Sequence, residues 1–242
     1  MESQLSAKPP FVVFEYMTGG SLADYLRHQR LDFEGAALLL RQLSSALAVF
    51  HSKGGFHRDI KPDNVLIGPD GSFVLADANL AGMPTSSSSF TQNVAGTPGY
   101  IDPYVVNHPY DSAADIWSLA VTILEAITGD RPSVESLQNG VVHLGATPAP
   151  TDGHRTALER LLGSMLSKVR SRRPAAMLVH TYADVLLRGG QLPPLAEPPR
   201  QPQSDIGSAI AGIGILALIF VGVAALMEPG PQPKAKGTKP GG

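Results

Sequence analysis

The sequence contains no cysteine, few aromatic residues and little charge. Without thiols the chain can form no disulfide, no cysteine nucleophile and no cysteine-ligated zinc site, which is compatible with a reducing cytosol. Charged residues make up 17% of the chain, and the net charge of -2 gives no electrostatic basis for binding nucleic acid. The start, MESQLSAKPP, lacks a basic region and an apolar stretch, so we expect no secretory signal and a cytosolic N-terminal domain.

One long apolar run lies near the C-terminus. Residues 206–227 read IGSAIAGIGILALIFVGVAALM and contain no charged residue. A helix of this length measures about 33 Å, enough to cross a hydrocarbon core of roughly 30 Å. A buried core helix is the alternative, but core helices of this length usually carry a polar stripe, and this run has none. We therefore predict one transmembrane helix.

Composition divides the chain into four parts. Residues 1–187 have the mixed polar and apolar pattern of one folded domain. Residues 188–205, RGGQLPPLAEPPRQPQSD, are rich in proline and glycine and predict a linker. The predicted transmembrane helix at 206–227 follows, and residues 228–242 form a short flexible tail of lysine, proline and glycine.

The charges around the apolar run favour one orientation and the domain favours the other. Three lysines follow the run, whereas Arg200 alone closely precedes it, so the positive-inside rule would place the tail in the cytosol. That orientation would require export of a large domain without a signal. We therefore predict a single-pass membrane protein with residues 1–187 in the cytoplasm.

Residues 1–187 show the pattern of a mainly helical (α+β) domain. Residues 11–14 predict a short apolar strand, and residues 34–51 repeat apolar side chains at helical spacing. Two apolar runs, 65–67 and 73–75, flank GPDGS and predict a hairpin. Further helices are expected at residues 113–128, 156–167 and 175–187.

The segment 54–67, GGFHRDIKPDNVLI, contains the residue types that phosphoryl transfer requires. This reaction needs a carboxylate to orient the hydroxyl and accept its proton, oxygen ligands for Mg²⁺, and cations against the phosphates. Asp59 and Asn64 fit the pattern H-R-D-x-x-x-x-N, and Lys61 lies between them. Asp77 follows beyond the predicted hairpin and supplies a second carboxylate.

With these motifs the chain resembles the C-terminal lobe of a eukaryotic-type (Hanks-type) serine/threonine protein kinase, as found in bacterial membrane-anchored kinases. The resemblance implies that Asp59 is the catalytic carboxylate and that Lys61 contacts the transferred phosphate. Asn64 and Asp77 would hold Mg²⁺ through their side-chain oxygens. The implied cofactors are ATP and Mg²⁺, and the implied substrate is a protein hydroxyl.

Further segments match the same family in its order. GTPGYIDPY resembles the end of an activation segment, with Thr97 near the substrate hydroxyl, and DIWSLA resembles the buried helix whose Asp115 supports the catalytic loop. FEYMTGGSL resembles the hinge, in which backbone groups of Glu15 and Met17 would face adenine. Residues 85–91, TSSSSFT, lie where activation loops accept phosphate, but an ordinary flexible loop has the same composition.

The resemblance begins at the hinge, and the 242 residues contain no G-x-G-x-x-G loop and no V-A-I-K-like strand. Positioning of the nucleotide is most of what such a catalyst provides, so we expect no appreciable phosphotransfer from these residues alone. The apolar strand at 11–14 should be covered by an upstream lobe, by a partner chain that supplies the lobe, or by a homo-oligomer.

Two further departures from the family pattern concern packing. The Asp-Phe-Gly motif reads Asp-Ala-Asn at residues 77–79, which keeps the metal ligand and loses the aromatic ring. Tyr104 stands where the family has a glutamate that pairs with an arginine, here Arg173. An unpaired buried charge costs about 3 to 5 kcal/mol. We expect that the Tyr104 ring stacks on Arg173, or that Asp102 takes the pair instead.

Two functions remain open on the sequence. The favoured one is a membrane-anchored serine/threonine protein kinase of which this sequence is a truncated form, because the catalytic loop is complete. The alternative is a pseudokinase that acts as a membrane-tethered binding or scaffold module, because the small lobe is missing and residues 77–79 and Tyr104 depart from the pattern.

Overall fold

The computed structural model of the chain describes residues 2–4, 11–78, 96–138, 142–145, 147–188, 192 and 195. Several predictions from the sequence lie outside these residues and are not tested by the structure. They concern the transmembrane run at 206–227, the tail at 228–242, the serine-rich segment at 85–91, and Asn79.

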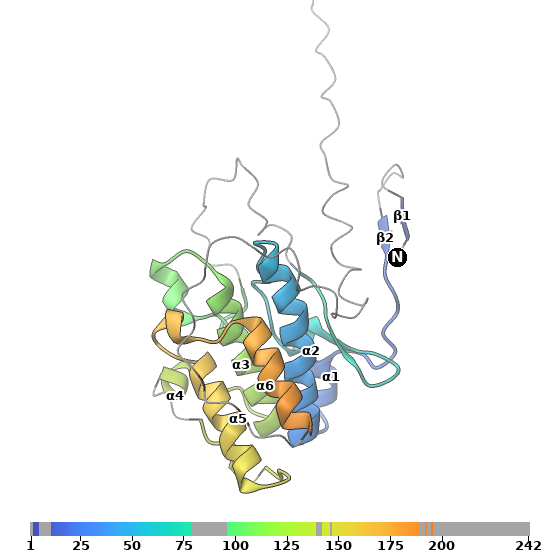
Figure 1. The fold of residues 1–242 in the computed structure, drawn as a ribbon. Coiled ribbons are helices and arrows are strands. Elements are labelled where there is room, and N and C mark those ends of the chain that lie inside the picture. Colours follow the sequence, from blue (N-terminus) through green and yellow to red (C-terminus); the bar gives the residue numbers. More distant parts are fainter. Residues whose placement is uncertain are drawn as a thin grey trace, which may run out of the picture.

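Helices dominate the part of the chain that the structure describes (Figure 1). The α-helices are α1 (Leu22–Leu26), α2 (Phe33–Ser52), α3 (Ser112–Thr128), α4 (Val134–Gln138), α5 (Asp152–Met165) and α6 (Ala176–Arg188). Short 3-10 turns are η1 (Pro62–Asn64), η3 (Pro103–Asn107) and η4 (Arg170–Arg172). Two antiparallel sheets pair β1 (Glu2–Gln4) with β2 (Phe11–Val13), and β3 (Val65–Ile67) with β4 (Phe73–Leu75). The predicted mainly helical (α+β) class is confirmed.

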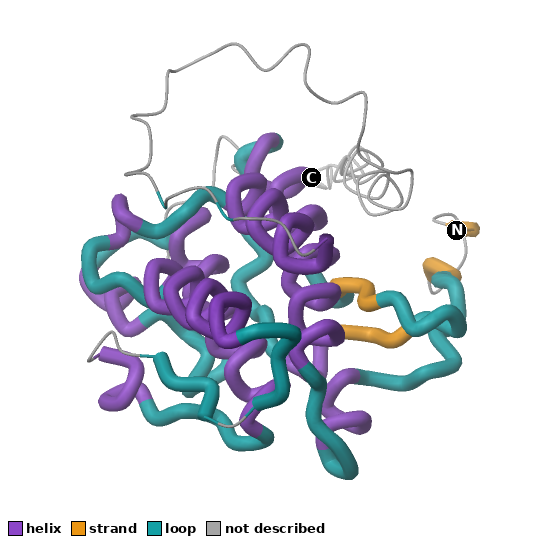
Figure 2. Tube along the Cα trace, turned by 60° about the horizontal axis from the view of Figure 1, so that its bottom comes forward, coloured by secondary structure: helices purple, strands orange, loops and turns teal. Residues whose placement is uncertain are grey.

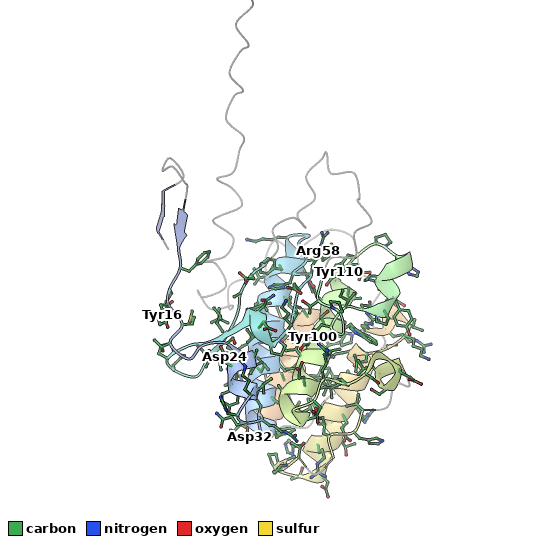
Figure 3. The ribbon with its side chains drawn as sticks, turned by 180° about the vertical axis from the view of Figure 1, so that it is seen from behind. Tyr16, Asp24, Asp32, Arg58, Tyr100 and Tyr110 are labelled. Carbon is green, nitrogen blue, oxygen red and sulfur yellow. The ribbon has the colours of Figure 1, made fainter. Side chains whose placement is uncertain are left out.

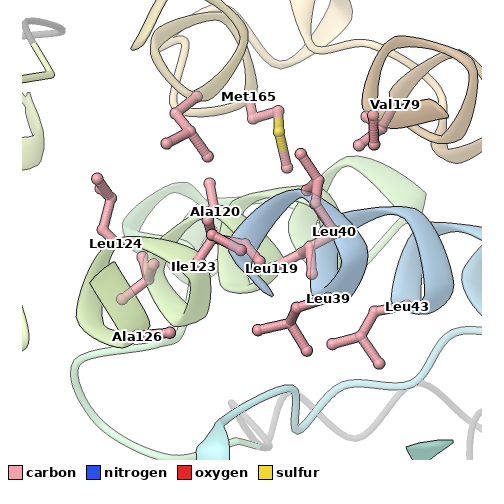
Figure 4. Close-up of a cluster of buried hydrophobic side chains, with 14 of the residues drawn as sticks. Leu39, Leu40, Leu43, Leu119, Ala120, Ile123, Leu124, Ala126, Met165 and Val179 are labelled. Carbon is pink, nitrogen blue, oxygen red and sulfur yellow. The ribbon is translucent and has the colours of Figure 1, made fainter. Parts of the chain in front are cut away.

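Helix α2 packs against α6, α3 and strand β4, and α3 is buried along most of its length. Figure 4 shows Leu40 of α2 beside Leu119 of α3, with Leu43 further along α2 and Met165 of α5 and Val179 of α6 above them. All five side chains are fully buried. Burial of one such side chain stabilises the fold by roughly 1.5 to 3 kcal/mol, so this cluster fixes the helices that carry the functional loops.

Helix starts follow capping side chains. Ser21 and Asp24 form a reciprocal capping box at α1, and the side chain of Asp32 accepts the Gly35 amide at α2. The sequence expectation for α5, a start near residue 156, is wrong by four residues. The Thr151 side chain accepts the amide of His154, which starts this helix at Asp152.

The predicted hairpin after residue 64 is present (Figure 2), with Val65 opposite Leu75 and Ile67 opposite Phe73. Its turn contains Gly71 at φ 78°, a conformation that favours glycine. The predicted strand at 11–14 is β2, and it pairs with β1, which the sequence did not predict. Figure 1 shows this second sheet away from the helical body.

Arg173 has a carboxylate partner and an aromatic partner, so both sequence alternatives are confirmed. Its Nη1 and Nη2 atoms donate to Asp102 at 2.5 and 3.1 Å, and neither side chain is exposed. The guanidinium carbon lies 5.8 Å from the ring centroid of Tyr104 and 5.0 Å from that of Trp117. The ion pair is therefore formed two residues earlier in the chain than the family pattern places it.

Helix α3 ends at Gly129, which has φ 82° and donates its amide to the Glu125 carbonyl at 2.8 Å. The side chain of Arg30 lies where a Cβ at this position would project. We expect Gly129→Ala to lower the free energy of unfolding by about 1 to 2 kcal/mol, because a left-handed backbone is strained for residues with a Cβ. Urea unfolding measures the change.

Gly153→Ala is the matched control for this substitution. Gly153 lies in the first turn of α5, and an added Cβ there meets only the Thr151 hydroxyl at an ordinary 3.5 Å. The control should leave stability unchanged or raise it slightly, because alanine is the better helix former. Equal losses for the two variants would contradict the role given to the backbone of Gly129.

Among the described helices, α2 is long and apolar enough to cross a membrane. Its buried residues, including Leu39 and Leu47, form the core against α3 and α6, so we interpret it as a core helix. Leu192 and Leu195, within the predicted linker, are partly buried against the same core. The described positions of the linker therefore lie on the lobe.

Candidate active site

The predicted catalytic loop follows α2 and leads into β3, and a buried carboxylate on α3 holds its backbone. The amides of His57 and Arg58 donate to Asp115 at 2.9 and 3.0 Å. The Asp115 side chain is completely buried. This confirms the expectation that Asp115 supports the loop.

Two further side chains donate to Asp115. His51 Nε2, on α2, lies 2.9 Å from one carboxylate oxygen, and the Tyr110 hydroxyl donates to the other at 2.7 Å. Burial raises the pKa of Asp115, but the His51 contact and the amides of His57 and Arg58 outweigh it, so the net pKa is lowered. Asp115 therefore stays ionised and joins α2, the catalytic loop and the segment before α3.

The residue before the candidate catalytic aspartate has a strained backbone. Arg58 has φ 72°, a region that non-glycine residues seldom occupy. Its guanidinium carbon lies 5.6 Å from the ring centroid of Tyr110, and both residues are labelled in Figure 3. The Asp115 contacts and this stacking hold the strained turn in place, which sets the direction in which Asp59 leaves the loop.

Asp59, Lys61 and Thr97 form one hydrogen-bonded cluster. The Thr97 hydroxyl and amide both donate to Asp59 Oδ1, at 2.7 and 3.1 Å. Lys61 Nζ lies 2.9 Å from Asp59 Oδ2 and 2.6 Å from Thr97 Oγ1. Residues from two distant segments therefore meet at one carboxylate.

The charge of this carboxylate follows from its neighbours. Partial burial raises the pKa of Asp59. This effect is outweighed by the hydrogen bonds from Lys61 and Thr97, the positive charge of Lys61 and the hydrogen bond from the Asn64 amide, which all lower the pKa. The net pKa is below the usual value for aspartate, so Asp59 is ionised at neutral pH. An ionised carboxylate at this position can accept a hydrogen bond from a substrate hydroxyl.

Asn64 connects the loop to the segment that carries Asp77. Its Nδ2 donates to the Asp59 carbonyl at 2.8 Å and to the Asp59 carboxylate at 2.9 Å. The Ala76 amide donates to the Asn64 carbonyl at 2.8 Å, and His57 Nε2 donates to the Ala76 carbonyl at 2.9 Å. Asp77 follows at φ 55° with an exposed side chain. These contacts tie the position before Asp77 to the catalytic loop.

The residues present fit a magnesium ion bound together with a nucleotide. Asn64 uses its Nδ2 within the loop, no hydrogen bond among the described residues uses its Oδ1, and Asp77 offers an exposed carboxylate. Amide and carboxylate oxygens are the ligands that Mg²⁺ takes in such sites, with substrate phosphates and water completing the shell. Among the described residues, no group of three or more acidic or histidine side chains forms a complete metal site.

The predicted adenine-facing residues lie between β2 and α1. Glu15 is exposed and Met17 is half-buried, and the Met17 carbonyl accepts the Gly20 amide at 3.3 Å. Tyr16, between them, lies far from Arg58 in Figure 3. The adenine contacts remain a prediction.

Sequence reasoning missed His51 and Tyr110. His51 lies in the last turn of α2, six residues before His57, and Tyr110 precedes the cap of α3. Neither is part of the H-R-D-x-x-x-x-N pattern. Their proximity to a motif would have been the signal, but their common partner, Asp115, is visible only in the folded chain.

The chain belongs to the protein kinase family, since the protein kinase domain model matches residues 3–182, most of the sequence. Proteins similar to the chain include serine/threonine-protein kinases, which confirms the resemblance to the Hanks type.

Of three such relatives, two come from animals and one from a plant. Serine/threonine-protein kinase PAK mbt from Drosophila melanogaster is 37% identical over 50% of this chain and 19% of its own length. CBL-interacting protein kinase 8 from Oryza sativa subsp. japonica is 37% identical over 52% of this chain and 29% of its own. Serine/threonine-protein kinase PAK 1 from Mus musculus is 36% identical over 61% and 27%. The chain therefore spans less than a third of each relative.

Proposed function

We propose that the chain supplies the substrate-side lobe of a serine/threonine protein kinase that transfers the γ-phosphoryl group of ATP to a protein hydroxyl. The observation that carries the proposal is the cluster in which Asp59 contacts both Lys61 and Thr97, with Asn64 alongside. Its members come from the catalytic loop and from the segment after residue 95, so local sequence alone does not explain their meeting.

Each residue of the cluster has a chemical role in this proposal. Bound Mg-ATP would supply the phosphoryl group. Asp59 orients the substrate hydroxyl and takes its proton as the oxygen is phosphorylated. Lys61 would offset the negative charge at the transferred group, and Asn64 and Asp77 would hold the metal. The lowered pKa makes Asp59 a weak base, so orientation is its larger contribution.

The remaining parts of the proposal concern nucleotide binding and location. The backbone of Glu15 and Met17 would face adenine. Residues 206–227 would anchor the protein in a membrane as a single span, with residues 1–187 in the cytoplasm and residues 188–205 as the linker. Protein substrates are the expected partners, and a homo-oligomer or partner chain would cover the segment around Tyr16, which is 84% exposed.

Asp59→Asn tests the catalytic role. In protein isolated from source membranes or expressed together with a kinase small lobe, Mg²⁺-dependent transfer from ATP to a serine peptide should fall at least about a hundredfold. Asp70→Asn is the control, because Asp70 is an exposed carboxylate in the β3–β4 turn. The 242 residues alone should transfer no appreciable phosphate, and activity unaffected by Asp59→Asn would refute the proposal.

A binding or scaffold module is the second candidate, because Ala78 lacks the aromatic side chain that the family places after the metal-binding aspartate. The intact mass of the native protein separates the two. A mass above 25.5 kDa by a small lobe would favour the kinase, with Asp59, Lys61, Asn64 and Asp77 in the roles above. A mass of 25.5 kDa together with no transfer would favour the module.

A further inference from the structure

An exposed arginine lies beside the Asp59 cluster and has no part in the chemistry proposed above. Arg131 follows the end of α3, and its guanidinium carbon lies 5.2 Å from the ring centroid of Tyr100. Cation–π contacts of this kind orient a guanidinium and leave its charge in place. The position of this charge relative to Thr97 determines what it can contact.

The backbone in contact with Arg131 belongs to Gly99, which has no side chain. Gly99 has φ 94°, and a Cβ built there would lie 2.8 Å from Arg131 Nε and 3.0 Å from the guanidinium carbon. The arginine therefore lies flat along the Gly99 backbone and against the Tyr100 ring. Any side chain at position 99 would displace it, and the left-handed backbone there favours glycine as well.

The Tyr100 ring is itself held through its hydroxyl, which lies near Arg131 as well as Glu125. Its hydroxyl donates to Glu125 on α3 at 2.5 Å. Burial raises the pKa of Tyr100 and the Glu125 bond raises it further, so the phenol stays a protonated donor at neutral pH. The ring is 6% exposed, so it is a fixed platform for Arg131.

A tight turn connects this platform to the candidate reaction centre. The Tyr100 amide donates to the Thr97 carbonyl at 3.1 Å, and the Thr97 hydroxyl donates to Asp59. Gly99 is two residues from Thr97, so their Cα atoms are at most about 7 Å apart. A peptide whose hydroxyl reaches Asp59 must therefore pass close to Arg131.

Arg131 carries its positive charge at the exposed surface of the described lobe. In the described part of the chain, no carboxylate lies within the 4.0 Å of an ion pair with its guanidinium. Two acidic side chains are close in the fold. Glu125 is half-buried and accepts from Tyr100, and Asp130 is exposed and adjacent in sequence. A planar, exposed guanidinium of this kind can bind a carboxylate of another molecule.

We propose that Arg131 is a specificity-determining residue that selects protein substrates with an acidic residue close to the acceptor serine or threonine. The inference rests on the proposed function, since Asp59 marks where the acceptor hydroxyl lies. The position of the acid along the substrate is set by the distance from Thr97 to Arg131, which a few extended residues span.

Peptide binding to the full chain in detergent tests the proposal without requiring phosphotransfer. Fluorescent serine peptides would carry one glutamate at successive positions on either side of the serine, each paired with its glutamine counterpart. At one or two adjacent positions, glutamate should tighten binding by about two- to fivefold, as exposed ion pairs do, and salt should weaken this preference.

Variants separate a charge contact from a structural one. Arg131→Gln should abolish the difference between glutamate and glutamine peptides, and Arg131→Lys should retain part of it. Arg188→Gln, at the exposed end of α6, should change nothing. A loss of affinity for both peptides alike in Arg131→Gln would assign the arginine a purely structural role and overturn the proposal.

The remaining outcomes also decide the question. A preference for lysine or arginine peptides would show that Glu125 and Asp130 dominate this surface, which would overturn the proposal. A glutamate preference that depends on Arg131, in a protein that transfers no phosphate even with a small lobe supplied, would refute the proposed function and keep the peptide site.

Discussion

Asp102→Ala should lower the free energy of unfolding by about 3 to 5 kcal/mol, because it leaves the buried Arg173 guanidinium without its carboxylate. Both side chains are completely shielded from solvent, and Arg173 cannot lose its proton to relieve the penalty. Asp102 also accepts the Tyr104 amide at 3.0 Å, which starts η3. Urea unfolding of the detergent-solubilised full chain, followed by circular dichroism, measures the loss.

Two comparisons make this test specific. Asp184→Ala removes a carboxylate that is 25% exposed and pairs with Arg188 at 2.9 Å and Arg41 at 3.4 Å, so it should cost at most about 1 kcal/mol. Adding Tyr104→Glu to Asp102→Ala restores the Ala-Pro-Glu pattern of the family. This double variant should recover part of the lost stability. An Asp102→Ala loss no larger than that of Asp184→Ala would refute the buried pair as a stabilising feature.

The second large effect is expected for Asp115→Asn. The substitution preserves shape but replaces one of the two accepting oxygens by an NH₂ group, which cannot accept. Either the His51 side chain and the His57 amide, or the Tyr110 hydroxyl and the Arg58 amide, then lose their acceptor. Leaving buried donors unpaired and removing a buried charge should cost about 3 kcal/mol or more. Fluorescence of Trp117, the single tryptophan, follows the unfolding in urea. A change below 1 kcal/mol would contradict this role.

The same variant predicts a pH dependence. The folded-state pKa of Asp115 is lowered, so its stabilisation is fully present above the ordinary aspartate pKa, near 4, and is lost as the pH falls towards the folded value. The difference in stability between the native chain and Asp115→Asn should therefore be constant from pH 7 to about 5 and shrink below 4. A stability difference that grows as the pH falls would contradict the lowered pKa of Asp115. Asp111→Asn, with a carboxylate 51% exposed, is the control.

The sequence predicted those features of the site that are encoded in short motifs. Asp59, Lys61 and Asn64 lie within a few residues of one another, and Asp115 belongs to a second compact motif, so local spacing was sufficient. For Arg173 the sequence predicted two alternative partners, the ring of Tyr104 and the carboxylate of Asp102. The structure has both, because a guanidinium donates from its edge and stacks through its face.

Contacts between distant segments were beyond the reach of sequence patterns. His51 and Asp115 are 64 residues apart in the chain, and their contact depends on how α2 crosses α3. Arg131 meets Tyr100 only because the end of α3 returns to the turn after Thr97. The start of α5 was missed for a local reason, since the Thr151 cap outweighs the weak apolar periodicity before residue 156.

The packing of Leu192 and Leu195 on the lobe affects how far the lobe could travel from a membrane. With the proposed span starting at residue 206, the stretch from Leu195 to that span could bridge at most about 35 Å. Diffusion of the lobe would then be confined to a thin layer at the bilayer surface. Substrates anchored in the same membrane would meet it at a high effective concentration, so modest affinity for an acidic peptide would suffice there.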